Sequence, residues 1–322
     1  MLAFGSYPTP VACLEPLSTA KTTLWVKRDD LSDPVYGGSK PRKLARLLAD
    51  ATSRGFSRVV TVGAVGSHHV LATGVFGKRM GLSVAAVVLR QPQSRHVLET
   101  ARASLGQGVE LVPAASYGEA ARYLAQSRAN GLYAIPAGGS SPLGTLGVVA
   151  AVLELAEQVR AGLLPEPDLI VLPLGSGGTA AGLSLGLVRA GLRTRVLAIA
   201  IAEPVEVLTC KAQALVEELA EPAERAAARA RFTVERRYLG QGYGFPTSAS
   251  EHATSEAQRC GLSLDHTYTG KAFAAALDRV QLGSERHVLF WHTLSSADLA
   301  PLLLDAPREH ELPSALRRLA YG

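Results

Sequence analysis

The sequence predicts an α/β protein with two open, twisted, mostly parallel sheets and helices on both faces of each sheet. Apolar strand-like runs alternate with longer helical patterns through nearly all of the 322 residues, which is typical of parallel sheets. Several runs are continuous Val, Ile, Leu and Ala, as in strands buried on both faces. A Pro/Gly/Ser-rich stretch at 136–144 indicates a hinge, so we expect two lobes.

The predicted elements follow in chain order. Strand patterns occupy 23–27, 58–62, 83–89, 109–112, 132–135, 168–174, 195–201 and 287–291. Helical patterns occupy 41–53, 68–80, 97–105, 117–129, 143–160, 179–190, 205–219, 248–260 and 269–281. We expect a small domain at 44–145, inserted into a large domain formed by 1–43 and 146–322.

Composition narrows the class of protein. The chain is 47% hydrophobic and carries a net charge of +5, with basic residues scattered rather than clustered with aromatic ones. That scatter predicts a solvated surface and no nucleic-acid partner. No apolar run approaches the ~20 residues of a membrane span, and no signal peptide is evident. Cys13, Cys210 and Cys260 have neither metal-binding nor disulfide spacing. We therefore expect a cytoplasmic protein without a metal or a membrane partner.

Lys40 is the most informative single residue. Two glycines and a serine precede it, and Pro41 suits the first position of a helix. A lysine at a helix N-terminus feels the positive end of the helix dipole, which favours its neutral, nucleophilic form. Arg42 and Lys43 act in the same direction. These features favour a Schiff-base lysine, and a solvated basic helix start is the alternative.

A glycine loop, GSGGTAAG, follows the predicted strand at 168–174 and opens the next predicted helix. Such a loop presents backbone amides and a helix N-terminus to an anion. Ser176 and Thr179 add hydroxyl donors. The loop therefore predicts a phosphate site.

The same loop fits a loose dinucleotide-binding pattern through Gly175, Gly177 and Ala180, with Glu203 after the next predicted strand. A nicotinamide-dependent dehydrogenase is therefore an alternative. The loop lies in mid-chain and has four small residues at 176–179. Both features favour a site for a single phosphate over a dinucleotide site.

Eight motifs in order carry a family resemblance. They are 7–10 (YPTP), 27–30 (KRDD), 37–43 (GGSKPRK), 62–69 (VGAVGSHH), 133–139 (YAIPAGG), 175–182 (GSGGTAAG), 242–246 (GYGFP) and 268–271 (YTGK). With them the chain resembles pyridoxal-phosphate enzymes of the tryptophan synthase β-like fold, fold type II. Within that type it is similar to the D-cysteine desulfhydrase and 1-aminocyclopropane-1-carboxylate deaminase family.

The resemblance implies roles for individual residues. Lys40 would bind pyridoxal phosphate as a Schiff base and move the Cα proton of the substrate. Ser67, His68 and His69 would meet the substrate carboxylate and the cofactor ring. Tyr243 and Tyr268 would lie in the active site, and Thr269 would face the pyridine nitrogen. The phosphate would be held by Gly175, Ser176, Gly177, Gly178 and Thr179.

The chain departs from the family pattern at three places. Ser39 and His68 replace amide side chains, and Leu294-Ser295 replaces two glycines. The deaminase branch has Glu in place of Thr269, and a neutral hydroxyl favours an unprotonated pyridine nitrogen, which suits β-elimination. We therefore expect a lyase that converts a small amino acid to pyruvate and ammonia, with D-cysteine as the best substrate. Deamination of 1-aminocyclopropane-1-carboxylate, another β-substituted substrate, and a non-catalytic cofactor-binding relative remain open. A homodimer is implied by resemblance.

Overall fold

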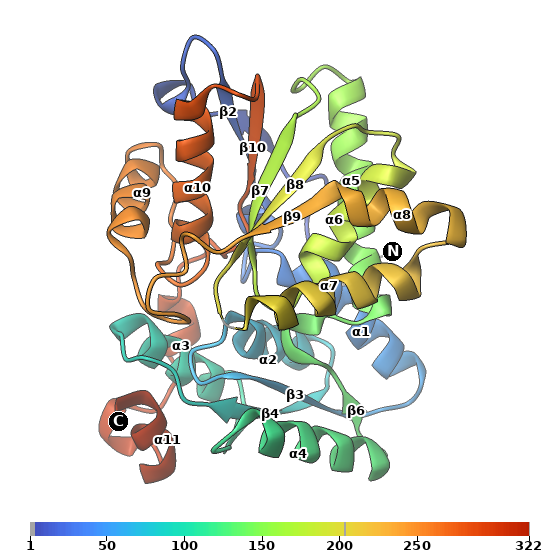
Figure 1. Cartoon of the computed structure of the whole chain (residues 1–322). Helices are drawn as coiled ribbons and strands as arrows, with labels where there is room; N and C mark the ends of the chain where they lie inside the picture. The colour runs from blue at the N-terminus through green and yellow to red at the C-terminus, as the bar shows by residue number, and fades with distance from the viewer. Residues whose placement is uncertain (1–3, 203, 322) are drawn as a thin grey trace. The chain divides into compact units, whose positions relative to one another are not determined.

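The computed structural model describes residues 4–202 and 204–321 and confirms an α/β fold with two mostly parallel sheets (Figure 1). Its larger compact unit comprises residues 5–43 and 142–296 and holds a six-stranded sheet of order β1-β2-β10-β7-β8-β9. These strands are β1 (Val11–Cys13), β2 (Thr23–Lys27), β7 (Leu169–Leu174), β8 (Arg195–Ala200), β9 (Phe232–Glu235) and β10 (His287–Trp291). Every neighbouring pair is parallel except β1 and β2.

Helices cover both faces of the six-stranded sheet (Figure 1). They are α5 (Pro142–Arg160), α6 (Gly178–Arg189), α7 (Val205–Leu219), α8 (Pro222–Arg231), α9 (Ser248–Arg259) and α10 (Thr269–Leu282). Strand β7 shows why its sequence is apolar throughout. Ile170 and Leu172 pack in the core beneath α5 and α6, whereas Leu169 and Val171 pack beneath α9 and α10.

The smaller compact unit comprises residues 44–141 and 297–321, with Phe4. Its parallel sheet has the order β5-β4-β3-β6. The elements are α1 (Lys40–Ser53), which begins in the larger unit, β3 (Arg58–Ala64), α2 (His68–Arg79), β4 (Ser83–Leu89), α3 (Arg95–Gly106), β5 (Val109–Pro113), α4 (Tyr117–Ala129), β6 (Tyr133–Ala134) and α11 (Ser314–Tyr321). On β4, Val87 packs towards α4, whereas Val84 lies against Gly77 of α2.

Sequence reasoning missed short or weakly patterned elements. These are β1, β9, α8, α11 and the 3-10 turns η1 (Glu15–Leu17), η2 (Asp29–Leu31), η3 (Ala137–Gly139), η4 (Ala300–Leu303) and η5 (Glu309–Glu311). Helix α8 is rich in Ala and Arg and has no large apolar side chain. A reciprocal capping box between Glu221 and Glu224 starts it. The structure groups residues 297–321 with the smaller unit, whereas we expected them in the large domain. The domain division drawn from sequence stays a prediction.

Among the described residues, α5 is long and apolar enough to cross a membrane by length and composition alone. The apolar face of α5 packs against α6, and glycines of α6 let the two helices lie close together. A Cβ at Gly182 would lie 2.5 Å from Val148 Cβ, and one at Gly186 would lie 2.7 Å from Val152 Cβ. This close packing accounts for the apolar character of α5.

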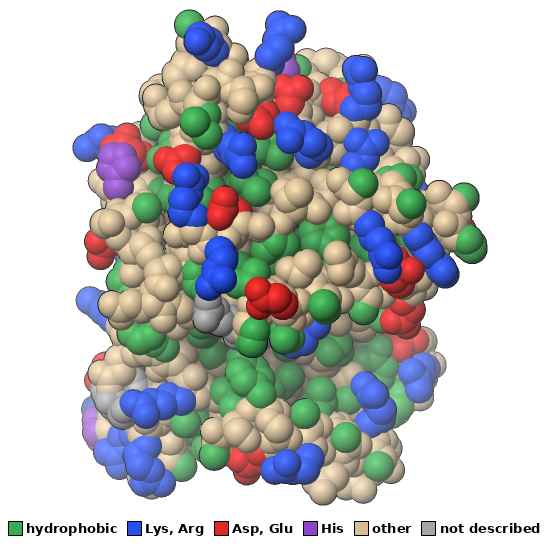
Figure 2. All heavy atoms as spheres, viewed as in Figure 1, with side chains coloured by type: hydrophobic (Ala, Val, Ile, Leu, Met, Phe, Trp, Pro, Cys, Tyr) green, Lys and Arg blue, Asp and Glu red, His purple; other side chains and the backbone are tan. Residues whose placement is uncertain are grey.

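The visible surface in Figure 2 shows basic and acidic side chains interspersed, with no broad field of one sign. Ion pairs such as Arg189–Glu224 and Arg229–Glu217 account for part of this pattern. This mixture of charges is typical of a surface in contact with water.

Candidate active site

Lys40 is the first residue of α1, and its approach is set by main-chain contacts. Gly38 has φ +88° and donates its N–H to Asp29 O at 2.8 Å. A Cβ at Gly38 would lie 2.6 Å from Thr293 O, so this position needs glycine. The Lys40 Nζ donates to Ser39 Oγ at 3.3 Å. Burial lowers the pKa of Lys40 to about 8, while Asp265 raises it in part. A useful neutral fraction of Lys40 therefore exists near neutral pH.

A buried ionic network holds the first turn of α1. Arg42 donates to both carboxylate oxygens of Asp29 and reaches Glu154 Oε2 at 2.9 Å. Lys27 pairs with the other oxygen of Glu154 at 2.5 Å, and the Trp291 indole donates to Asp29 Oδ2 at 2.8 Å. Because these charges are almost fully buried, removing one partner would leave another unpaired at high cost. The network fixes the direction in which α1 presents Lys40.

Leu294 and Ser295 stand where the family pattern has two glycines, and their side chains leave the chain before Lys40 in place. Leu294 is buried, and Ser295 Oγ accepts a hydrogen bond from Gly37 N at 2.9 Å. The preceding His292 is fully buried, and neither ring nitrogen makes a hydrogen bond of good geometry. Burial lowers the pKa of His292, so its ring is neutral.

The glycine loop connects β7 to α6, as predicted, and its backbone requires glycine at one point. Gly177 has φ +91°, and a Cβ there would lie 2.9 Å from Ala212 N. Lys43 Nζ donates to Thr179 Oγ1 at 3.2 Å. Burial, and then Lys40, holds the pKa of Lys43 well below its usual value. A phosphate would restore the charge of this buried lysine while the first-turn amides of α6 bind it, so the loop fits the expected cofactor.

Lys43 was not among the residues predicted to bind the cofactor. Its position one helical turn after Lys40 could have suggested it, because residues three apart lie on the same side of a helix. Glu203, on which the dinucleotide alternative depended, lies outside the described residues.

Tyr243 and Tyr268 come together, as the resemblance implied for one site. Their hydroxyl oxygens lie 2.5 Å apart, and their rings meet edge to face at 84°. Tyr268 also lies beside the glycine loop, since a Cβ at Gly175 would be 3.8 Å from its ring. The buried Lys271 donates to Leu239 O and Gly242 O and thereby fixes the loop that carries Tyr243. Burial lowers the pKa of Lys271 to about 8.

Asp265 is a residue that the sequence reasoning overlooked. It caps the start of α10, where its carboxylate accepts from Tyr268 N at 2.6 Å and from Thr269 Oγ1 at 2.7 Å. The Thr269 hydroxyl therefore donates its proton to Asp265. Its oxygen accepts from Asp265 N at 2.9 Å and has one lone pair left for a further partner. Such an oxygen, backed by a carboxylate, would favour a protonated pyridine nitrogen, contrary to the interpretation drawn from Thr269 alone.

The smaller unit brings Ser67, His68 and His69 together at the start of α2. Ser67 is the N-cap, and its Oγ accepts from His69 N at 3.2 Å. His69 is buried, with Nε2 2.8 Å from Thr61 Oγ1. His68 instead extends to His96 on α3. The first-turn amides of this largely buried helix start can bind an anion, as a substrate carboxylate would need.

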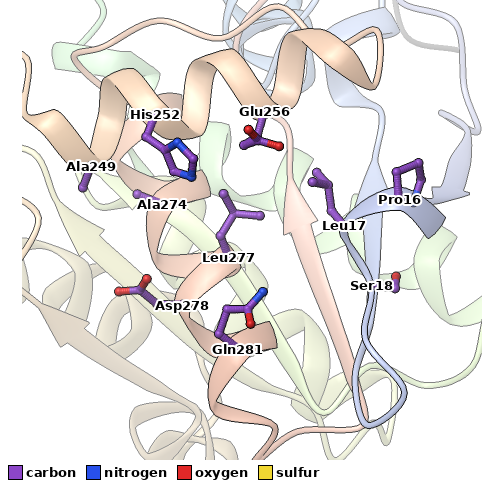
Figure 3. A pocket seen from close by; sticks show the side chains of 10 residues that line it. All are labelled: Pro16, Leu17, Ser18, Ala249, His252, Glu256, Ala274, Leu277, Asp278 and Gln281. Atoms are coloured by element: carbon purple, nitrogen blue, oxygen red, sulfur yellow. The ribbon is translucent and has the colours of Figure 1, made fainter.

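A surface pocket of about 440 Å³ lies elsewhere in the larger unit (Figure 3). The side chains of His252 and Glu256 from α9 and of Leu277 from α10 line it. None of the residues predicted for the active site contributes to this pocket, so it carries no part of the candidate site.

Comparisons with known proteins identify the family and the fold. Residues 2–293 match the family described as pyridoxal-phosphate dependent enzyme. A protein from Pyrococcus horikoshii, provisionally named a 1-aminocyclopropane-1-carboxylate deaminase, is 37% identical over 302 residues, 89% of each chain. The D-cysteine desulfhydrase of Klebsiella pneumoniae is 32% identical over 89% of this chain and 91% of its own. The crystal structure of an ACC deaminase homologue superposes with a TM-score of 0.74 at 33% identity, covering 92% of this chain and 94% of that one.

Proposed function

The chain belongs to the family of pyridoxal-phosphate dependent enzymes, in the group that includes D-cysteine desulfhydrases and 1-aminocyclopropane-1-carboxylate deaminases, and from this premise we propose that it is a β-eliminating lyase. Its substrate would be a small β-substituted amino acid, with D-cysteine as the best candidate. The products would be pyruvate, ammonia and the released β-substituent, which is sulfide in the case of cysteine.

The observation that carries this proposal is the state of Lys40. It is held at the start of α1 by the Arg42–Asp29–Glu154 network, and its pKa is lowered to about 8. An amine that is partly neutral near physiological pH can bind an aldehyde covalently and can afterwards accept a proton. Lys40 would hold the cofactor, and the 175–179 loop with Lys43 would hold its phosphate.

The residues of the proposed site would bind the substrate and move its protons. Bound pyridoxal phosphate supplies an electron sink for the carbanion that forms at Cα. Lys40 Nζ would take the Cα proton, while Ser67 with the amides at His68 and His69 would bind the substrate carboxylate. The paired hydroxyls of Tyr243 and Tyr268 would hold the proton that the leaving thiolate takes up. Released 2-aminoacrylate then hydrolyses in water to pyruvate and ammonia.

Ring-opening deamination of 1-aminocyclopropane-1-carboxylate is the second candidate, and Asp265 favours it. That reaction has no leaving group to drain the carbanion, so it needs a strong electron sink. The Asp265–Thr269 hydrogen bond at 2.7 Å places a negative charge one hydroxyl away from the atom that would meet the ring nitrogen. This arrangement weakens the argument that Thr269 alone makes against deamination.

A substrate panel separates the candidates. The purified holoenzyme would be incubated with D- and L-cysteine, β-chloroalanine, D-serine and 1-aminocyclopropane-1-carboxylate. Equal amounts of pyruvate and sulfide from D-cysteine are expected. 2-Oxobutanoate from the cyclopropane substrate, without pyruvate from the others, would replace elimination by deamination. Silence across the panel, with the visible band of the bound cofactor present, would leave a non-catalytic relative as the explanation.

Two further expectations stay proposals. A homodimer is supported by the family resemblance, and a cytoplasmic location is supported by the cysteine spacing. Sedimentation of the purified chain would test the first.

A further inference from the structure

Gln91 lies just beyond the end of β4, and its side chain contacts the turn that leads into α2. Only 7% of this residue is exposed. Its side-chain oxygen Oε1 accepts a hydrogen bond from Gly66 N at 3.1 Å. Gly66 directly precedes Ser67, the N-cap of α2. The Gln91 amide therefore lies next to the helix start that the proposed reaction uses for the substrate carboxylate.

The strand register explains why these two segments meet. Strands β3 and β4 are parallel and pair Ala64 with Leu89, so both segments leave the sheet at its carboxyl edge. Val65 N donates to Leu89 O at 2.8 Å and extends the contact beyond the last pair. A Cβ at Gly66 would lie 2.8 Å from Val97 Cα, so α3 packs directly on the turn. The carboxyl edge of parallel strands is where open α/β sheets bind ligands.

The contact with Gly66 determines the orientation of the Gln91 amide. Only the oxygen of an amide side chain can accept from a backbone N–H, so the nitrogen Nε2 takes the other position. This nitrogen has no hydrogen-bond partner within the part of the chain that the structure describes, and it is not enclosed by protein atoms. An almost fully buried side chain thus keeps its N–H donors for water or a ligand.

Ser67 supplies another donor at the same helix start. Its Oγ accepts from His69 N at 3.2 Å, so the hydroxyl proton is available to a ligand. The first-turn amides of α2 add the positive end of the helix dipole. A carboxylate only accepts hydrogen bonds, so it suits this set of donors.

From this arrangement we propose that Gln91 is a further substrate-binding residue, whose Nε2 donates a hydrogen bond to the carboxylate of the amino-acid substrate. The inference rests on the proposed function, because the carboxylate belongs to the same substrate. Gln91 would thereby add to the selection of amino acids over amines that lack a carboxylate.

The test measures amino-acid binding without turnover. Alanine has no β-leaving group, and its binding to the holoenzyme is followed through the shift of the cofactor's visible band. Gln91→Glu keeps the size of the side chain and an oxygen for Gly66 N, but it puts negative charge in place of Nε2. Its affinity for alanine should fall about a hundredfold or more, because like charges repel. Ethylamine lacks the carboxylate and should bind this variant no more weakly than wild type.

Two further variants complete the test. Gln91→Leu removes both the acceptor and the donor, and it decides the matter if Gln91→Glu folds poorly. It should bind alanine roughly 10- to 100-fold more weakly and keep its affinity for ethylamine. Gln93→Leu changes an exposed glutamine two residues further along and should bind like wild type. Thermal melting curves report the folding of each variant.

Three results would overturn the proposal. They are a folded Gln91→Glu variant that binds alanine as tightly as wild type, equal losses of alanine and ethylamine affinity, and a wild-type band that does not respond to alanine. Failure of the proposed lyase is seen separately, as absent pyruvate from cysteine, because the alanine titration requires no elimination.

Discussion

The starts of α1 and α2 differ in the groups that hold them: buried ion pairs at α1 and a hydroxyl cap at α2. Lys40 opens α1 beside a nearly buried network in which Arg42 pairs with both Asp29 and Glu154. The start of α2 is capped by the Ser67 hydroxyl and carries the half-buried His68, whose Nε2 lies 3.1 Å from Nε2 of His96 on α3. The first start is rigid because each charge needs its partner. The second is held by neutral hydrogen bonds, so a substitution there leaves no buried charge unpaired.

The largest expected effect comes from Lys40→Ala. Loss of the amine removes covalent capture of the cofactor and the base for the Cα proton, so turnover should fall by about 10²–10⁴-fold or more. The visible absorbance band and borohydride-dependent labelling should vanish. Lys78→Ala, an exposed lysine of α2, is the matched control and should keep both. A labelled, active Lys40→Ala enzyme would remove Lys40 from the mechanism.

Arg42→Met breaks the network at the start of α1. It leaves Asp29 and Glu154 with unpaired buried charge, which should lower the free energy of unfolding by about 3–5 kcal/mol. Denaturant unfolding measures the loss. His96→Gln removes the partner of His68 on α3 and should cost under about 1 kcal/mol, because the half-buried His68 remains reachable by water. Equal losses in the two variants would contradict the contrast drawn between these regions.

Lys43→Met tests the cation beside the glycine loop. Without the ammonium, affinity for pyridoxal phosphate should fall roughly tenfold or more, equivalent to about 1.4 kcal/mol. Spectroscopic titration of the apoenzyme measures it. Pyridoxal lacks the phosphate and should bind wild type and variant alike. If pyridoxal affinity fell by the same factor, Lys43 would act on the fold rather than on the phosphate.

The pH dependence of cofactor capture gives the smallest effect. Because burial lowers the pKa of Lys40 to about 8, the rate of capture by apoenzyme should rise up to tenfold per pH unit below pH 8 and level off above it. An unfolded lysine keeps its proton to about pH 10.4. Between these values folding releases a proton, so Lys40 and Lys271 make stability rise with pH in that window. Capture that kept rising past pH 9 would contradict the lowered pKa.

Local signals were enough to predict the two helix starts on which the candidate site depends. The proline after Lys40 marked the start of a helix, and the glycines at 175–178 marked a strand-to-helix turn, since both depend on the backbone preferences of a few adjacent residues. Continuous apolar runs identified the buried strands. Helix α8, in which alanine and one proline are the only apolar residues, gave no comparable signal.

By itself the sequence determined the alternation of strands and helices, the family, and the positions of Lys40 and of the phosphate loop, because these are written in short spans of neighbouring residues. Only the tertiary structure decided which distant side chains meet. It paired His68 with His96, set Asp265 behind Thr269 and brought Lys43 to Thr179. The direction of a hydrogen bond and the pKa of a buried group depend on distances of a few ångströms between such partners, and spacing along the chain does not encode those distances.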